Sequence, residues 1–190
     1  MKHTMKNHKE MEEQKLIDGV IRHDRRSQRM LYERFAPLML SVCFRYVNDY
    51  EVAKDLLQDG FVKVFNSIAT YQGAGSFEGW VRKVFSNLCM EYLRKNDVLR
   101  DSLVLEDPSV LFEPDYSMIE RLSADELMEI IAELPTGFRT VFNMYAIEGY
   151  SHKEIADSLG ITESTSRSQF TRARQYLQKK LLELGSDGKE

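Results

Sequence analysis

The sequence predicts an all-α protein: two small helical domains joined by an acidic linker, the second a helix-turn-helix domain. The chain has 190 residues, enough for one ordinary domain or two small ones. It contains only ten Gly and four Pro, too few for the turns that many short strands require. Apolar residues recur at spacings of three and four along most of the chain, which is the period of an amphipathic helix.

Acidic residues are concentrated in one middle segment. Residues 97–126 hold nine Asp and Glu against two Arg, and two of the four Pro also lie there. Residues 1–96 hold 16 basic and 12 acidic residues, so the overall net charge of −4 hides a basic first half. We therefore predict an N-terminal domain at 1–96, a linker at 97–123 and a C-terminal domain at 124–190.

The first domain reads as four helices, at residues 11–23, 25–47, 49–70 and 77–95. Pro37 is expected to bend the second helix. Asn48 and Glu51 have the spacing of a capping box and would begin the third helix. The Gly-containing segment 71–76 is the loop that precedes the fourth helix.

The second domain also reads as four helices, at residues 123–134, 138–147, 151–158 and 162–184. Ser151 and Glu154 form a capping-box pattern at the start of the third of these. Gly160 suits a turn that needs a positive φ, and Thr162 can cap the last helix.

Residues 151–175 match the helix-turn-helix pattern of a short helix, a tight Gly turn and a longer basic helix. Residues 165–180 contain five basic residues and no acidic one, so this helix can meet phosphates. Ser166 stands where many such motifs have Val or Ile, and we expect its hydroxyl to bond back to a carbonyl of the preceding turn. The alternative is a helical hairpin with a solvated basic face.

Two segments of the first domain suggest binding surfaces. The third helix has an apolar stripe for the core and beside it a second stripe of Gln58, Val62 and Phe65. A helix of this kind often packs on a partner, although burial on both sides within one domain is the alternative. Residues 77–87 alternate aromatic and basic side chains, a composition that suits unpaired nucleic acid, although such rings are often core residues.

Together these blocks resemble the extracytoplasmic-function (ECF) sigma factors, the small two-domain members of the bacterial sigma-70 family. The resemblance covers about residues 12–95 and 124–183. It is carried by a series of short motifs in the family's order and spacing: Leu31-Tyr32-Glu33, Ala53 to Phe61, Gly75 to Arg82, Tyr92 to Lys95, Leu134-Pro135, Phe138-Arg139, Glu148 to Ser151, Glu154 to Ala156, Leu159 to Ile161 and Arg172 to Arg174.

The resemblance implies three sets of site residues. In the first domain, the third helix would bind core RNA polymerase through Asp55, Gln58, Asp59, Val62 and Phe65. The loop and fourth helix would read and melt the minus-ten promoter element through Tyr71, Ser76, Phe77, Trp80, Arg82, Lys83, Asn87, Arg94 and Lys95. The helix-turn-helix would bind the minus-thirty-five element as duplex through Ser164, Arg167, Ser168, Thr171, Arg172, Arg174 and Lys179, the last three at phosphates.

The resemblance also implies a role for the linker and for a further partner. The acidic linker would thread the channels of polymerase, where its charge mimics nucleic acid. Family members are commonly held inactive by an anti-sigma factor.

No pattern in the chain predicts an enzyme, a cofactor or a metal site. The four His have no metal-ligand spacing, and no nucleophile, base and acid arrangement is legible. Cys43 and Cys89 are far apart and read as buried thiols of a reduced compartment. No run approaches the roughly 20 apolar residues of a membrane span, so we expect a cytoplasmic protein. The alternative functions are a helix-turn-helix regulator that acts without core polymerase and a small helical enzyme.

Overall fold

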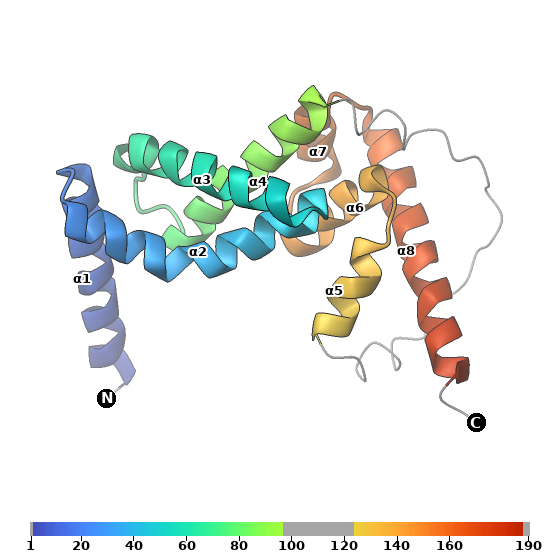
Figure 1. Ribbon diagram of the computed structural model, residues 1–190, viewed down its shortest axis with the longest axis horizontal. Coiled ribbons are helices and arrows are strands. Elements are labelled where there is room, and N and C mark those ends of the chain that lie inside the picture. Colours follow the sequence, from blue (N-terminus) through green and yellow to red (C-terminus); the bar gives the residue numbers. More distant parts are fainter. Residues whose placement is uncertain (1, 97–123, 188–190) are drawn as a thin grey trace. The chain divides into compact units, whose positions relative to one another are not determined.

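The computed structural model describes residues 2–96 and 124–187 (Figure 1). All regular elements in these ranges are helical, which confirms the all-α prediction. Contacts between Cα atoms divide the chain into two compact units, one of Met1–Phe44 with Asp49–Cys89 and the other of Arg45–Asn48 with Met90–Glu190. The linker predicted at 97–123 lies outside the described residues, so the domain boundaries stay a prediction. Among the described helices, none combines the length and the apolar character needed to cross a membrane.

The first unit is built from the N-terminal helices. They are α1 (Lys2–Ile21), α2 (Arg25–Val47), α3 (Tyr50–Ser67), the 3₁₀ turn η1 (Ile68–Thr70) and α4 (Phe77–Lys95). The end of α2 from Arg45 and the end of α4 from Met90 are counted with the second unit. Helix α1 begins nine residues earlier than expected, since residues 2–10 contain no Gly or Pro and their polar residues are compatible with a helix. Helix α2 continues through Pro37 over its full 23 residues.

The capping box predicted for the third helix is wrong. Asn48 has a left-handed backbone, with φ of 52°, a region that Asn enters more readily than most residues. Asp49 is therefore the N-cap of α3, and its Oδ1 accepts the N–H of Val52 at 3.0 Å.

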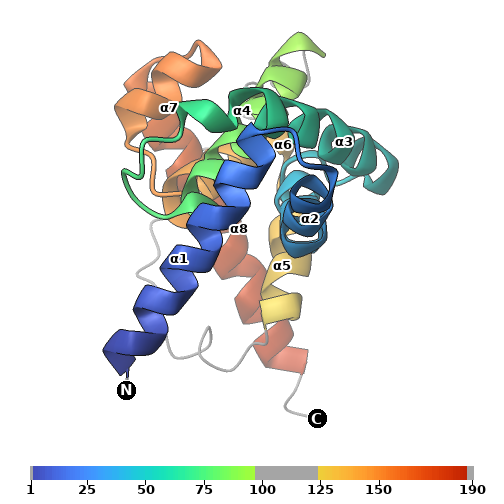
Figure 2. The same ribbon diagram turned by 90° about the vertical axis from the view of Figure 1, so that its left-hand side faces the viewer.

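The core of the first unit is formed where α2, α3 and α4 meet. Helices α2 and α3 lie side by side in both views (Figures 1 and 2), and the rings of Tyr32 and Phe61 are 4.6 Å apart. Phe61 in turn packs edge to face on Phe85 of α4 at 5.3 Å. The predicted core stripe of α3 is confirmed, because all four of its members are buried: Leu57, Phe61, Val64 and Ile68. Cys43 and Cys89 are buried free thiols, as expected.

The second unit contains the C-terminal helices. They are α5 (Ala124–Ala132), α6 (Thr136–Phe142), the π-helical turn η4 (Asn143–Ile147), α7 (His152–Leu159) and α8 (Glu163–Asp187). The single helix predicted at 138–147 therefore changes type at Asn143, and the N–H of Glu148 donates to the Asn143 carbonyl at 2.9 Å across the wider turn. The core lies between α5, α6 and α8 (Figure 1) and consists of Ile130, Ile131, Leu134, Phe138, Ala173, Leu177 and Leu181.

The helix-turn-helix geometry at α7 and α8 agrees with the prediction. The N–H of Glu154 donates to Ser151 Oγ at 3.3 Å, and the N–H of Ser151 donates to the Glu154 carboxylate at 2.8 Å, which completes the capping box. Gly160 ends α7 with φ of 69°, a conformation that a side chain would oppose. Thr162 Oγ1 accepts the N–H of Thr165 at 3.0 Å and caps α8.

Candidate functional site

The side of α3 opposite the core carries a surface that we call the α3 face: Asp55, Gln58, Asp59, Val62 and Phe65. Val62 is 58% exposed, which is high for an aliphatic side chain at the centre of a helix. Gln58 is exposed beside it, and Phe65 is half-buried with its ring 6.0 Å from that of Phe61. The α3 face is thus available to a partner, and the alternative of a helix buried on both sides does not hold.

The loop between η1 and α4 is ordered by one aromatic side chain. Tyr71 donates its hydroxyl to the Gly75 carbonyl at 2.8 Å, and its ring lies 5.8 Å from that of Trp80. Gly73 and Gly75 have φ of 74° and 83°, so this course of the loop depends on glycine at both positions. The loop is a preformed rim around the start of α4.

Phe77 lies inside the fold and not on the proposed nucleic-acid surface. Its side chain is 0% exposed, packs on Phe35 at 5.7 Å and stacks under Trp80 at 5.8 Å. The reason is positional, since the first residue of α4 faces the core while Trp80, three residues later, is half-buried at the rim. Phe77 therefore supports Trp80 and does not itself present a ring to a ligand.

Helix α4 carries the cationic and polar residues predicted for this site. Arg82 is half-buried and pairs with Glu78 at 3.0 Å. The other members are exposed along the helix: Lys83, Asn87, Arg94 and Lys95. An exposed row of this composition beside an aromatic ring suits a single strand, because cations follow the backbone while bases stack.

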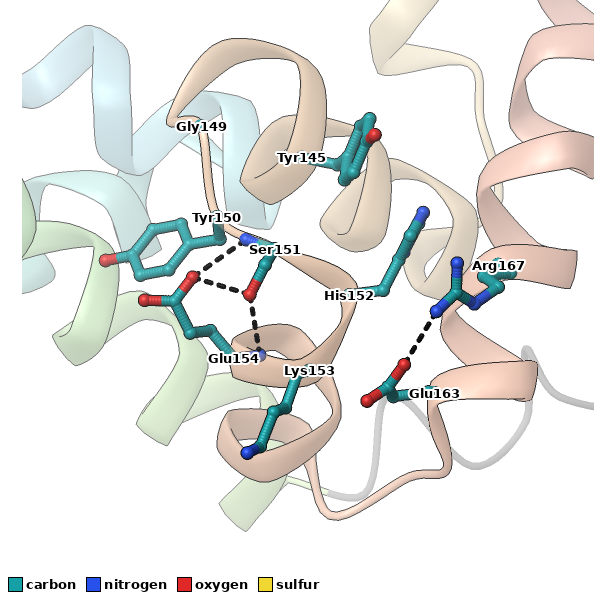
Figure 3. A pocket seen from close by; sticks show the side chains of 9 residues that line it. All are labelled: Tyr145, Gly149, Tyr150, Ser151, His152, Lys153, Glu154, Glu163 and Arg167. Atoms are coloured by element: carbon teal, nitrogen blue, oxygen red, sulfur yellow. Dashed lines mark hydrogen bonds and ion pairs between the residues drawn. The ribbon is translucent and has the colours of Figure 1, made fainter.

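The first turns of α8 present the second predicted polar surface, which we call the α8 face: Ser164, Arg167, Ser168 and Thr171. All four residues are exposed, and the Arg167 guanidinium pairs with Glu163 at 2.7 Å (Figure 3). Ser168 and Thr171 donate their hydroxyls to carbonyls of their own helix, each at 3.0 Å. Farther along α8, Arg174 and Lys179 are exposed and Arg172 is half-buried.

A pocket of about 610 Å³ lies beside this face (Figure 3). Residues of η4, of α7, of the loop between them and of α8 line it: Tyr145, Gly149, Tyr150, Ser151, His152, Lys153, Glu154, Glu163 and Arg167. Sequence reasoning missed His152, which points from α7 toward Tyr145 and Arg167. The sequence signal that could have indicated a polar partner here was Ser166, a polar residue at a helix position that normally faces the core.

The hydroxyl of Ser166 does not make the bond to its own helix that the sequence suggested. Ser166 is fully buried, and its Oγ lies 2.9 Å from His152 Nδ1. Burial lowers the pKa of His152, and the positive charge of Arg167 lowers it further, whereas Glu163 acts in the opposite direction. The lowered pKa favours the neutral imidazole at pH 7.

Comparison with known proteins identifies both halves of the chain. Residues 31–98 match the family model of sigma-70 region 2, and residues 124–177 match that of sigma-70 region 4. Together the two matched segments cover more than half of the 190 residues.

Individual relatives are similar over most of this chain. It is 32% identical to the ECF RNA polymerase sigma factor SigE of Mycolicibacterium smegmatis over 83% of this chain and 62% of that protein. It is 26% identical to the RNA polymerase sigma-H factor of Pseudomonas aeruginosa, over 90% of this chain and 94% of that one. A solved structure, the sigma factor RpoE of Bartonella quintana with the anti-sigma factor NepR, matches with 21% identity and a TM-score of 0.49 over 82% of this chain and 96% of that one. The chain belongs to the sigma-70 family, as an ECF sigma factor of RNA polymerase.

Proposed function

We propose that the chain binds core RNA polymerase, brings it to specific promoters and helps to open the minus-ten region. The observation that carries the proposal is the exposure of Val62 at the centre of the α3 face, between polar and acidic neighbours. In a helix-turn-helix regulator that acts without core polymerase, this surface would instead have to serve ligand sensing or dimerisation. We assign the α3 face to core polymerase.

We assign the rim around Trp80 to the minus-ten element. A base flipped from a melted strand needs a concave polar edge and a ring to stack on, and flipping costs a few kcal/mol. The loop ordered by Tyr71 supplies the edge and Trp80 the ring, with Ser76 and the polar row of α4 along the strand. Phe77 serves this site from beneath.

We assign α8 to the minus-thirty-five element as duplex DNA. The α8 face lies at the start of the helix, where a recognition helix meets base edges in the major groove. Arg172, Arg174 and Lys179 lie on later turns and are assigned to phosphates, which give affinity without sequence preference.

The remaining parts of the proposal follow from family membership. The chain acts in the cytoplasm, has no catalysis of its own, and has an anti-sigma factor as a further partner. The acidic linker, outside the described residues, passes through the channels of polymerase.

The test is in-vitro transcription with purified core polymerase on fragmented genomic DNA of the source organism. New start sites that appear only with this protein would support the proposal, and their alignment would reveal both promoter elements. If polymerase stays silent and the protein neither co-elutes with it nor competes with other sigma factors, the helix-turn-helix regulator becomes the better assignment.

A pair of variants tests the α3 face by pull-down with core polymerase. Gln58→Ala combined with Phe65→Ala removes two of its side chains, and we expect weaker binding to core polymerase by a protein that still folds. Met11→Ala is the control, because Met11 is an exposed apolar residue of α1, 57% exposed and outside the α3 face. Equal affinity of the double variant and the control in a pull-down would contradict the assignment.

A further inference from the structure

A hydrogen bond between side chains joins the two helices of the helix-turn-helix at their N-terminal ends. His152 is the first residue of α7, and Ser166 lies in the first turn of α8. The 2.9 Å distance from His152 Nδ1 to Ser166 Oγ is that of a good hydrogen bond, and Ser166 is closed off from solvent. A buried hydroxyl without such a partner would carry a desolvation cost, so the bond favours one placement of α8 against α7.

The imidazole itself is held in place by aromatic rings. It stacks on Tyr145 of η4 with centroids 4.3 Å apart and planes within 14°. The ring of Phe170 of α8 and the imidazole pack edge to face, with their centroids 5.9 Å apart. The ring centroids of Tyr145 and Phe170 are 4.5 Å apart. Because these rings restrict His152, its nitrogen acts as a fixed point to which the first turn of α8 is attached.

The residue after Ser166 is Arg167, the centre of the α8 face. A small rotation of the first turn would move the Arg167 side chain relative to base edges, whereas hydrogen bonds to bases tolerate only small errors in direction. Ser168 bonds only within its own helix and cannot set this rotation. We propose that the His152–Ser166 hydrogen bond orients the start of α8 for discrimination among minus-thirty-five sequences, with His152 as a positioning residue that acts in its neutral form.

The charged groups around His152 make this arrangement sensitive to pH. Arg167 and Glu163 face it from α8, Lys153 and Glu154 lie beside it on α7, and the phenol of Tyr145 covers one ring face. With its own proton on Nε2, the neutral ring accepts at Nδ1 a hydrogen bond that the Ser166 hydroxyl donates.

Protonation reverses this hydrogen bond. Nδ1 then carries a proton and must donate to Ser166 Oγ, so the hydroxyl proton has to turn to another acceptor. The Thr162 carbonyl, which already accepts the N–H of Ser166 at 3.0 Å, is the acceptor one turn back. The imidazolium would also repel Arg167, and both changes disturb the α8 face.

The inference rests on the proposed function, and it is tested with the full-length protein bound to core polymerase. The probe is a DNA library with a randomised upstream element and the minus-ten region found by transcription. At pH 7.5 we expect Ser166→Ala to lower discrimination against single base-pair changes about three- to tenfold, the range for loss of one hydrogen bond. Ser86→Ala is the matched control, since Ser86 is an equally buried serine of α4 without a hydrogen-bond partner among the described residues.

The pH dependence of discrimination distinguishes a positioning role of His152 from a purely stabilising role. Discrimination is the ratio of the affinities for the preferred and the changed DNA sequence. A positive charge on His152 would strengthen the attraction to phosphates equally for both sequences, so this gain cancels in the ratio. Between pH 7.5 and 5.5 we expect the discrimination of the wild type to fall toward the Ser166→Ala value. The variant should change less, because it retains only the repulsion between His152 and Arg167. Equal discrimination by Ser166→Ala and Ser86→Ala, or parallel pH profiles for the wild type and Ser166→Ala, would overturn the inference.

A spectroscopic measurement tests whether the His152–Ser166 hydrogen bond exists, independently of any effect on transcription by polymerase. Imidazole ¹⁵N shifts of the free full-length protein report the tautomer of His152. We expect the Nε2–H form in the wild type and a mixture of tautomers in Ser166→Ala. Identical shifts in the two proteins would refute the hydrogen bond itself, whereas transcriptional silence with the expected shifts would refute the proposed function alone.

Discussion

Replacing Gly60 by Ala tests the contact between the helix assigned to polymerase and the helix assigned to the minus-ten element. A Cβ at this position would lie 2.6 Å from Phe85 Cδ1 and nearer still to two other atoms of that ring. Phe85 is fully buried and packs edge to face on Phe61, so its ring cannot turn away freely. The substitution therefore forces α3 and α4 apart.

The expected magnitude is the difference between two effects. Overpacking a tight core costs about 1–3 kcal/mol, and the buried ring places this case in the upper part of that range. Ala in place of Gly within a helix recovers about 1 kcal/mol of helix propensity. The net loss is about 1–2 kcal/mol, which for a unit of this size lowers the melting temperature by about 4–16 °C.

Thermal unfolding followed by circular dichroism measures this loss. Gly79→Ala is the matched control, because the nearest atom to its new Cβ is Ser76 Oγ at 3.0 Å, which accepts the N–H of Gly79, and no buried ring lies there. We expect the control to melt within a few degrees of the wild type, because the helix propensity gained, about 1 kcal/mol, is offset by a cost of similar size from disturbing the Ser76 cap. A Gly60→Ala protein that melts at or above the wild-type temperature would refute the close packing of α3 on α4.

Three further predictions concern single groups. Tyr71→Phe removes only the hydroxyl that holds the Gly75 carbonyl, so the rate of open-complex formation should fall by up to about tenfold at an unchanged melting temperature. An unchanged rate of promoter melting would argue against a preformed loop. Arg167→Ala should change the preference among DNA sequences, whereas Lys179→Ala should lower the affinity for all sequences evenly. Lys179→Ala should also lower by about one the slope of log affinity against log salt concentration. Equal effects of the two variants in binding titrations would show that the recognition face is misplaced. Because the pKa of His152 is lowered in the folded protein, the unfolded chain binds more protons at acid pH. The stability should therefore be highest above about pH 6.5 and should fall as the pH is lowered further. The melting temperature of His152→Phe should not show this fall.

Features that depend on neighbours in the chain were predictable. The helix-turn-helix follows from the spacing of Ser151 and Glu154 and from Gly160, because a capping box and a left-handed turn are made within a few residues. The outward stripe of α3 could be read from the helical period alone, and the structure leaves Val62 exposed. The start of the same helix was misplaced by one residue, since Asn48 and Asp49 are both suitable caps and only the backbone φ distinguishes them.

Assignments that depend on packing could not be made from the chain alone. Arg139 is an example, because it is buried and donates to the carbonyls of Ala132 at 3.0 Å and Leu134 at 2.9 Å. Burial lowers its pKa, which marks it as a structural residue that ties α6 to the end of α5. In the sequence it is the single basic residue of residues 123–150, and neither its position nor its neighbours show that it is buried.

The sequence by itself determined the helical class, the turn chemistry, the acidic middle segment and the surfaces that α3 and α8 turn outward, because periodicity and capping are short-range properties. Only the tertiary structure decided that Phe77 lies beneath Trp80 and that Ser166 bonds to His152, fourteen residues away and on another helix. These outcomes depend on which rings and hydroxyls are enclosed when helices pack, and enclosure is a property of the assembled fold that no local spacing encodes.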